Sequence, residues 1–443
     1  MMRAELIFIP APGVGHLVSA VEVARLVVGR DERISITILI IKMPFDSAAA
    51  ALTQNLQNDA QDRINFVDIP SPDESVMTKL MSLPRMSFLG SLLSEQRNQV
   101  RDVVREILNR SESSRLGGFV VDMFCTTMID VASDFNVPAY VFFTSSASFL
   151  GLMFYAQNLK DIENLEISEY KDSDIELSIP CFSNLVPAKV LPSVMLMESG
   201  SAMMTTIARR LRQTRAILVN TVLELEAYAI KSLKDDENIP HIYPVGPVIN
   251  FKKGEQTSKN KNSDEAIMRW LDRQPSSSVV FLCFGSMGSF NMEQVKEIAS
   301  ALELSGQRFL WSLRRPSQEK EKMELPKDYE DYDEVLPEGF LERTSGKGKV
   351  IGWAPQLVNE LGLAVKIKLD YRKEYFGPNE LPQLVTAEEI LSGLRGLMSE
   401  EGEMRDKVKT MKDICRKAVV EGGSSYNSLG QFIQDVIDNI DPS

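Results

Sequence analysis

Short apolar runs alternate with helical stretches along this chain, and this alternation limits its possible folds more than any other feature. The runs are Leu6–Ile9, Ile34–Ile41, Ile64–Asp68, Gly118–Asp122, Pro138–Phe143 and Ala216–Asn220, followed by Ser278–Phe284, Arg308–Leu313 and Lys349–Trp353. Short, nearly continuous apolar runs are typical of parallel strands buried on both faces. The pattern therefore predicts an α/β fold with parallel sheets.

The chain is too long for one ordinary hydrophobic core, so we expect two domains. The stretch Phe251–Asp264 is polar, rich in lysine and without periodicity, which is typical of an exposed linker. We therefore predict a Rossmann-like domain over 1–249, a linker over 250–264 and a second Rossmann-like domain over 265–443. After Gln356 only helices are expected, so the second sheet is short of strands. The last helix, Ser425–Ile440, is a candidate for packing back on the first domain.

Composition excludes several classes of partner. With 44% hydrophobic and 25% charged residues and a net charge of −13, the chain does not favour nucleic acid or an anionic membrane surface. The four cysteines are far apart in sequence, and no histidine lies at a metal-ligand spacing from any of them. No apolar run approaches the length of a membrane span. We expect a cytoplasmic protein with reduced thiols, no membrane span and no metal.

His16 is one of only two histidines, and it lies where the first strand gives way to the first helix. The positive end of a helix disfavours imidazolium, so we expect a neutral ring, the form that a general base needs. The alternative is a loop histidine that binds a neighbouring carbonyl. A dinucleotide site is disfavoured because Val18 occupies the position of the third glycine of that fingerprint.

Two polar groups follow other strands of the first half. Asp122 ends an apolar strand and could fix the tautomer of His16 if the two strands are neighbours; the alternative is a helix cap near Cys125. Thr144 begins a run of hydroxyl residues after Phe143, which suits either a polar ligand or helix capping.

The second half contains a candidate phosphate-binding loop. Ser286 and Gly288 lie between a buried strand and a helix that starts near Asn291, where backbone N–H groups can hold phosphate oxygens. No lysine completes a P-loop. Trp353, at the end of another strand, could stack on a base or fill a seam between domains.

Taken together, these segments resemble the plant UDP-dependent glycosyltransferases of small molecules. This family has the two-domain GT-B fold, and the likeness is greatest to its branch that acts on flavonoids and terpenoids. The segments are PAPGVGHLVS, FVVDMFCTTMIDVA, FFTSSA, ILVNTVLELE, IMRWLDRQPSSSVVFLCFGSMGSF, LPEGFLERT, VIGWAPQ and ELGLAVKIKLDYR. They cover nearly the whole chain in order.

The resemblance implies a role for each matching residue. His16 would deprotonate a hydroxyl of the acceptor, and Asp122 would balance its charge. On the donor side, Thr144 would contact the sugar, Ser286 and Gly288 the diphosphate, Trp353 uracil, and Ala354 and Gln356 the nucleoside. Val14, Phe124 and Met195 are candidate walls of an apolar acceptor pocket.

The same resemblance implies an inverting transfer from a UDP-sugar, most simply UDP-glucose, to a small hydroxylated plant metabolite of secondary metabolism. The UDP-sugar would be a co-substrate, with no cofactor and no metal, because protein donors neutralise the leaving phosphates. We expect a monomer.

The chain departs from the family pattern directly after WAPQ. The rest of the family's donor-binding signature is absent, and about 40 residues, enough for two strand-helix units, are lacking. Two interpretations stay open: an active glycosyltransferase, or an internally deleted, catalytically inactive homologue that binds only the acceptor.

Overall fold

The computed structural model describes residues 3–43, 53–54, 56–57, 62–110, 114–248, 261–285, 288–316, 326–352, 384–398 and 403–440. The chain forms two compact units, one of Met1–Thr257 with Ile414–Ser443 and the other of Ser258–Asp413. We had assigned 265–443 to the second domain and left open a return of the last helix. The structure places the last 30 residues, Ile414–Ser443, in the first unit.

The first unit is built on a seven-stranded parallel sheet in the order β3-β2-β1-β4-β5-β8-β9. Its strands are β1 (Arg3–Ile9), β2 (Ile34–Ile40), β3 (Ile64–Asp68), β4 (Ser114–Asp122), β5 (Ala139–Phe143), β8 (Ala216–Val219) and β9 (His241–Pro244). Six of the seven coincide closely with predicted apolar runs; β9 was not predicted. In the register, Leu6 pairs with Ile36 of β2 and Phe8 with Val120 of β4.

Helices cover both faces of this sheet, which explains why its strands are apolar on both sides. The helices of the first unit are α1 (Val14–Arg30), α3 (Glu74–Met81), α4 (Arg85–Arg110), η1 (Met123–Met128), α5 (Ile129–Asp134), α6 (Ala147–Asn158), η2 (Leu159–Glu163), η3 (Ile167–Tyr170), η4 (Ala188–Val190), α7 (Ser193–Leu196), α8 (Glu198–Leu211), α9 (Ala227–Asp235) and α15 (Ser424–Ile440). A small antiparallel pair, β6 (Glu176–Leu177) and β7 (Val186–Pro187), completes the unit.

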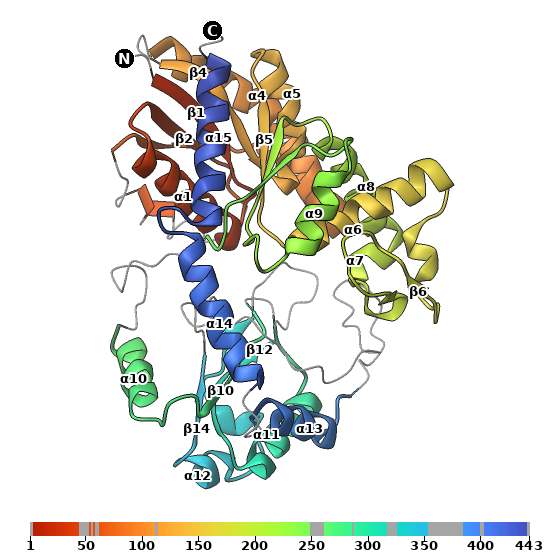
Figure 1. The fold of residues 1–443 in the computed structure, drawn as a ribbon, viewed down its shortest axis with the longest axis vertical. Coiled ribbons are helices and arrows are strands. Elements are labelled where there is room, and N and C mark those ends of the chain that lie inside the picture. Colours follow the sequence, from red (N-terminus) through yellow and green to blue (C-terminus); the bar gives the residue numbers. More distant parts are fainter. Residues whose placement is uncertain are drawn as a thin grey trace. The chain divides into compact units, whose positions relative to one another are not determined.

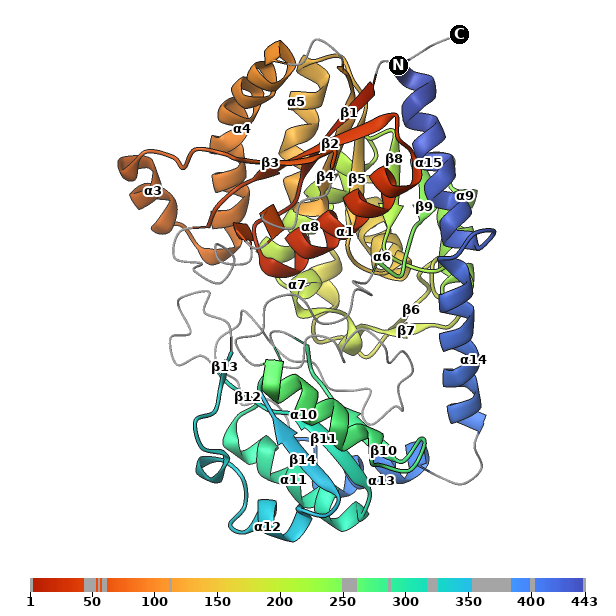
Figure 2. The same ribbon diagram turned by 90° about the vertical axis from the view of Figure 1, so that its left-hand side faces the viewer.

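Alternate residues of each central strand enter two separate cores. Leu6 and Phe8 of β1 pack with apolar residues of α1 and α15, whereas Ile7 and Ile9 face the core that contains residues of α4, η1 and α5. Figures 1 and 2 show α15, in blue, lying along the first unit with α1 nearby. Phe432 of α15 is fully buried there and meets the ring of Tyr140 edge-on, with 5.1 Å between centroids.

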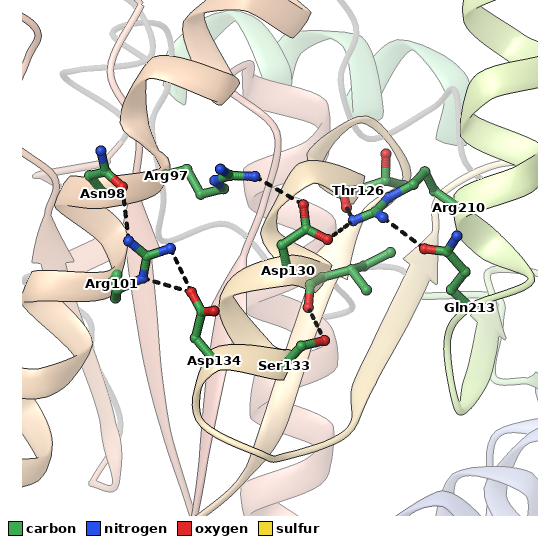
Figure 3. A network of polar contacts seen from close by, with 10 residues as sticks. Arg97, Asn98, Arg101, Thr126, Asp130, Ser133, Asp134, Arg210 and Gln213 are labelled. Atoms are coloured by element: carbon green, nitrogen blue, oxygen red, sulfur yellow. Dashed lines mark hydrogen bonds and ion pairs between the residues drawn. The ribbon is translucent and has the colours of Figure 1, made fainter.

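A network of charged side chains joins α4, α5 and α8 at the surface of the first unit (Figure 3). Asp130 of α5 pairs with Arg97 of α4 at 3.0 Å and also accepts from Arg210 of α8. Arg210 donates in addition to the carbonyl oxygen of Thr126 at 3.2 Å. Asp134 accepts from Nε of Arg101 at 2.7 Å. The network links three helices of the first unit.

The second unit has a parallel sheet in the order β10-β11-β14 over its described residues. Its elements are α10 (Lys261–Asp272), β10 (Val279–Leu282), α11 (Met292–Ser305), β11 (Arg308–Ser312), β12 (Arg314–Arg315), β13 (Lys327–Asp328), η5 (Tyr332–Glu334), α12 (Phe340–Thr344), β14 (Gly348–Ile351) and α13 (Ala387–Met398). Helix α14 (Glu403–Ala418) crosses the boundary between the units. None of the helices in the described ranges is long and apolar enough to cross a membrane.

Candidate active site

The sheet order of the first unit places two of the predicted residues at a topological switch point. From β1 the chain builds outward through β2 and β3, and it then returns to build β4 and β5 on the other side of β1. In sheets of this kind ligands bind beyond the carboxyl ends of the strands where the order reverses. The loop after β1 leads to His16 in the first turn of α1, and Asp122 is the last residue of β4.

The imidazole of His16 and the carboxylate of Asp122 are in direct contact. His16 Nδ1 lies 2.7 Å from Asp122 Oδ2, with 29% of the histidine side chain exposed and 2% of the aspartate side chain. Because a carboxylate only accepts, this contact assigns the ring hydrogen to Nδ1. Nε2 has no hydrogen-bond partner among the described residues, so it is the nitrogen that could take a proton from a substrate.

Asp122 also caps the following helix. Its Oδ1 accepts from the backbone N–H of Phe124 at 3.0 Å, at the start of η1. The two roles considered from the sequence, helix cap and partner of His16, are therefore filled by the two oxygens of one carboxylate. This cap fixes the rotamer that presents Oδ2 to the imidazole.

The pKa of His16 shifts in the direction opposite to the shift that the helix N-terminus alone would cause. Burial, the largest influence, lowers the pKa of His16, but the hydrogen bond and negative charge of Asp122 outweigh it, so the net pKa lies above its ordinary value. The expectation of a neutral ring rests on the helix N-terminus, whereas the net direction of the shift is set by the contact with Asp122. In the folded site, Asp122 stabilises the imidazolium that proton abstraction would create.

Thr144 lies in the same site. Its Oγ1 is 3.4 Å from His16 Nδ1, and it directly follows β5, the strand beside β4. Helix capping, the other role considered for the hydroxyl residues after Phe143, is also present here. Ser146 caps α6 by accepting from the N–H of Phe149 at 3.1 Å. Thus the site combines the last residue of β4 with one side chain from the segment that follows each of its neighbours, β1 and β5.

The three candidate walls of the acceptor pocket have different environments. Phe124 packs edge-on against the His16 ring, with 5.6 Å between centroids, and Val14 begins α1 two residues before His16. Met195 is fully buried in the main core of the first unit and contributes no exposed surface.

A cavity of about 90 Å³ lies beside the loop that leads from β1 to the helix of His16. It is lined by Pro10, Ala11, Pro12, Gly13, Leu17, Ile40, Ile41, Lys42, Met43 and Thr53. None of the three candidate wall residues lines it.

On the donor side, the structure describes only part of the predicted site. Ser286, Trp353, Ala354 and Gln356 lie outside the described residues, as does the junction after Gln356. Gly288 is described, and a Cβ at this position would lie 2.0 Å from the carbonyl oxygen of Phe284, so the loop after β10 closes tightly there. Asn291 caps the following helix α11 by accepting from the N–H of Gln294 at 2.9 Å.

Comparison with known proteins identifies the family. A family model described as UDP-glucoronosyl and UDP-glucosyl transferase matches residues 41–357. The chain belongs to this family. The glycosyltransferase is 46% identical to UDP-glycosyltransferase 71E1 of Stevia rebaudiana, over 98% of this chain and 99% of that protein. It is 44% identical to UDP-glucose flavonoid 3-O-glucosyltransferase 6 of Fragaria ananassa, over 98% of each chain.

Solved structures confirm the GT-B fold of the glycosyltransferase. A transferase from Siraitia grosvenorii in complex with UDP has a TM-score of 0.82 and 37% identity, covering 98% of this chain and 100% of that one. UGT71G1 of Medicago truncatula complexed with UDP-glucose has a TM-score of 0.79 and 36% identity, covering 98% of each chain.

The comparisons also bear on the departure after Gln356. The match to the family model ends at residue 357. The alignment with the Stevia protein spans 488 positions, whereas this chain has 443 residues, so at least 45 positions of it have no residue here.

One residue of the site region received no role from the sequence. Glu226, in the segment ILVNTVLELE, has a carboxylate that binds the start of α6, three residues after Thr144. In the sequence, Glu226 is distinguished only by its position directly before a helix. That position suggests a cap for the following helix, α9, and not a contact with α6.

Proposed function

We propose that the protein transfers a sugar from a UDP-sugar to a hydroxyl of a small, apolar plant metabolite, such as a flavonoid, another phenolic or a terpenoid. The observation that carries the proposal is the 2.7 Å contact between His16 Nδ1 and Asp122 Oδ2, which leaves Nε2 to accept a proton. Membership of the UDP-glucosyl transferase family supplies the reaction class. The names of the Fragaria relative and the Medicago complex support glucose as the sugar.

In the proposed reaction, His16 Nε2 takes the proton of the acceptor hydroxyl as its oxygen attacks the anomeric carbon of the sugar. The bond between that carbon and the diphosphate oxygen breaks, UDP leaves, and the configuration at the carbon inverts. Asp122 stabilises the imidazolium during this step. Thr144, Ser286, Gly288, Trp353, Ala354 and Gln356 are proposed to hold the donor, and the loop after β10 to neutralise the phosphates without a metal.

The proposal includes four further expectations from the sequence. The apolar neighbours of His16, Val14 and Phe124, form part of the acceptor pocket. The protein acts in the cytoplasm and as a monomer. Activity does not require a divalent cation, so excess EDTA should leave the rate unchanged.

The test is an assay of the purified full-length protein with UDP-glucose and a panel of phenolic and terpenoid alcohols. We expect UDP release coupled to one glycoside per UDP, with a β-linked product when the donor is the α-anomer. The variant His16→Ala should lower the rate by about 10²-fold or more, while Asp134→Asn, which changes an exposed carboxylate of α5, should not. If neither UDP release nor a glycoside is detected with any acceptor of the panel, the proposal is overturned.

A further inference from the structure

Glu226 directs its carboxylate away from its own helix and toward another. It lies directly before α9 but makes no side-chain cap there. Instead, Oε2 accepts from the N–H of Ala147 at 2.8 Å, and Oε1 accepts from the N–H and Oγ of Ser148 at 2.9 and 2.7 Å. Thr221 Oγ1 donates to the same carboxylate. The contacts with Ala147 and Ser148 lie at the first turn of α6.

These contacts complete the capping of α6. Its first two backbone N–H groups bind Glu226, and the third, that of Phe149, binds Ser146 Oγ. The positive end of the helix favours a carboxylate at this position. Burial, the largest single influence, raises the pKa of Glu226, but the hydrogen bonds from Ser148, Thr221 and Ala147 together lower it by more, so the net pKa lies below its ordinary value. Glu226 is therefore charged near neutral pH.

The turn that Glu226 holds is the continuation of the segment that carries Thr144. Only Ser145 and Ser146 separate Thr144 from Ala147, the first residue of α6. On its other side, Thr144 follows Phe143, whose carbonyl accepts from the N–H of Asn220 at 3.0 Å. A segment this short has little freedom once both ends are fixed. The distance of 3.4 Å between Thr144 Oγ1 and His16 Nδ1 thus depends on the anchor at α6.

We propose that Glu226 is a positioning residue for sugar transfer. Its carboxylate fixes the first turn of α6 and thereby holds Thr144 against His16. The inference rests on the proposed function, in which Thr144 contacts the donor and His16 the acceptor. Glu226 itself touches neither His16 nor Asp122 in the described contacts.

The test is a double-mutant cycle on the full-length protein. Glu226→Gln keeps the size of the side chain but turns an amide donor toward the backbone N–H groups of α6, so we expect kcat to fall about tenfold, with the KM of the acceptor changed by less than about twofold. In a Thr144→Val background the same change should cost almost nothing, because the group that it positions is already absent.

The matched control is Glu224→Gln. Glu224 lies two residues away in the same loop, and its carboxylate accepts from Ser424 Oγ of α15 at 2.9 Å instead of contacting α6. This variant should keep the wild-type kcat. Hydrogen exchange adds a readout that needs no activity: the amides of residues 147–149 should exchange faster in Glu226→Gln than in Glu224→Gln.

Several outcomes would overturn the inference. An unchanged kcat in Glu226→Gln would do so, as would an equal fall in kcat with and without the Thr144 hydroxyl, which would indicate a general loss of folding. If Glu226→Gln does not fold, Ser148→Ala removes one hydrogen bond only and should show the same dependence on Thr144 to a smaller extent. A wild-type protein that is inactive on every acceptor would instead reject the proposed function, and the positioning role with it.

Discussion

At the scale of single residues, the pair of His16 and Asp122 makes the pH dependence of activity a sharp test. The base must be neutral, so the rate should rise with pH through the pKa of His16. Asp122 raises that pKa, while burial lowers it. In Asp122→Asn the influence of burial remains and the carboxylate is lost. We therefore expect kcat to fall about 10²-fold or more and the midpoint of the pH profile to move to lower pH.

The measurement is kcat/KM from pH 5 to 9 for both proteins, supported by NMR titration of the His16 ring. Asp134→Asn serves as the control, since that exposed carboxylate pairs only with Arg101 in the described network. A midpoint that stays in place or moves to higher pH in Asp122→Asn would contradict the assignment of Asp122 as the charge partner of His16.

The residues of this site differ in how far the sequence could predict them. His16 and Asp122 stood out because each lies at the carboxyl end of an apolar strand, and the sheet order brings those ends together. The sign of the pKa shift of His16 did not follow, because it depends on a contact between residues 106 positions apart. The role of Glu226 was equally hidden, since its carboxylate binds a helix 78 positions earlier in the chain.

At the scale of elements, the pair of strands β1 and β2 contains a buried carboxyl group. Glu5 is 6% exposed and accepts from Thr37 Oγ1 at 2.7 Å and from Ser35 Oγ, both on β2. Burial, the largest influence, raises the pKa of Glu5, and the two hydroxyl donors offset it only in part. The folded protein is therefore less stable when Glu5 is ionised than when Glu5 is protonated.

The raised pKa of Glu5 predicts that the substitution Glu5→Gln stabilises the protein more as the pH rises. A group whose pKa is raised by folding contributes stability that is present below its unfolded pKa and is lost as pH rises through its folded pKa. The amide does not titrate, so the melting temperature of Glu5→Gln relative to wild type should increase as the pH rises from the ordinary pKa of a glutamate, about 4.3, through the raised pKa of Glu5. Calorimetry checks this, with the exposed Glu32→Gln as control. A difference that is flat or shrinks with pH would argue against a buried ionisable Glu5.

The network between α4, α5 and α8 should contribute little stability, although its contacts are many. The Asp130 side chain is 45% exposed, and exposed ion pairs typically contribute about 0–1 kcal/mol. We expect Asp130→Ala to lower the free energy of unfolding by about 1 kcal/mol or less at low salt, and by less still in 1 M NaCl. Urea titrations at both salt concentrations test this. The control is Asp102→Ala, whose 69% exposed side chain pairs only with Arg105 in the described contacts.

At the scale of the whole molecule, the apolar runs predicted the sheets well, because strands buried on both faces must be apolar throughout. Strand β9 was missed, since HIYP is short, begins with an exposed histidine and ends in proline. The order of the strands was not predicted from the runs, and the return of the last helix, Ser425–Ile440, to the first domain was only a candidate. Amphipathic periodicity shows that one face of a helix is buried, but it does not show which element of the fold covers that face.

The return of the last helix can be tested at Phe432. Its ring is fully buried between Tyr140 and Tyr243, with centroids 5.1 and 6.0 Å away, and α15 packs on β1, β4 and β9. Truncation of a buried aromatic side chain costs about 3–5 kcal/mol. Since α15 belongs to the first unit, Phe432→Ala should speed hydrogen exchange in β1 and β4 and leave exchange in α11 and β11 unchanged.

The neighbouring variant Gln431→Ala, at an exposed position of the same helix, controls for loss of helix propensity and should change neither pattern. If Phe432→Ala instead raised exchange equally in both sheets, the two units would unfold together. If it raised exchange in neither, α15 would not stabilise the sheet that carries His16 and Asp122. The positions of His16 and Asp122 would then depend on the strands of the sheet and not on helix α15.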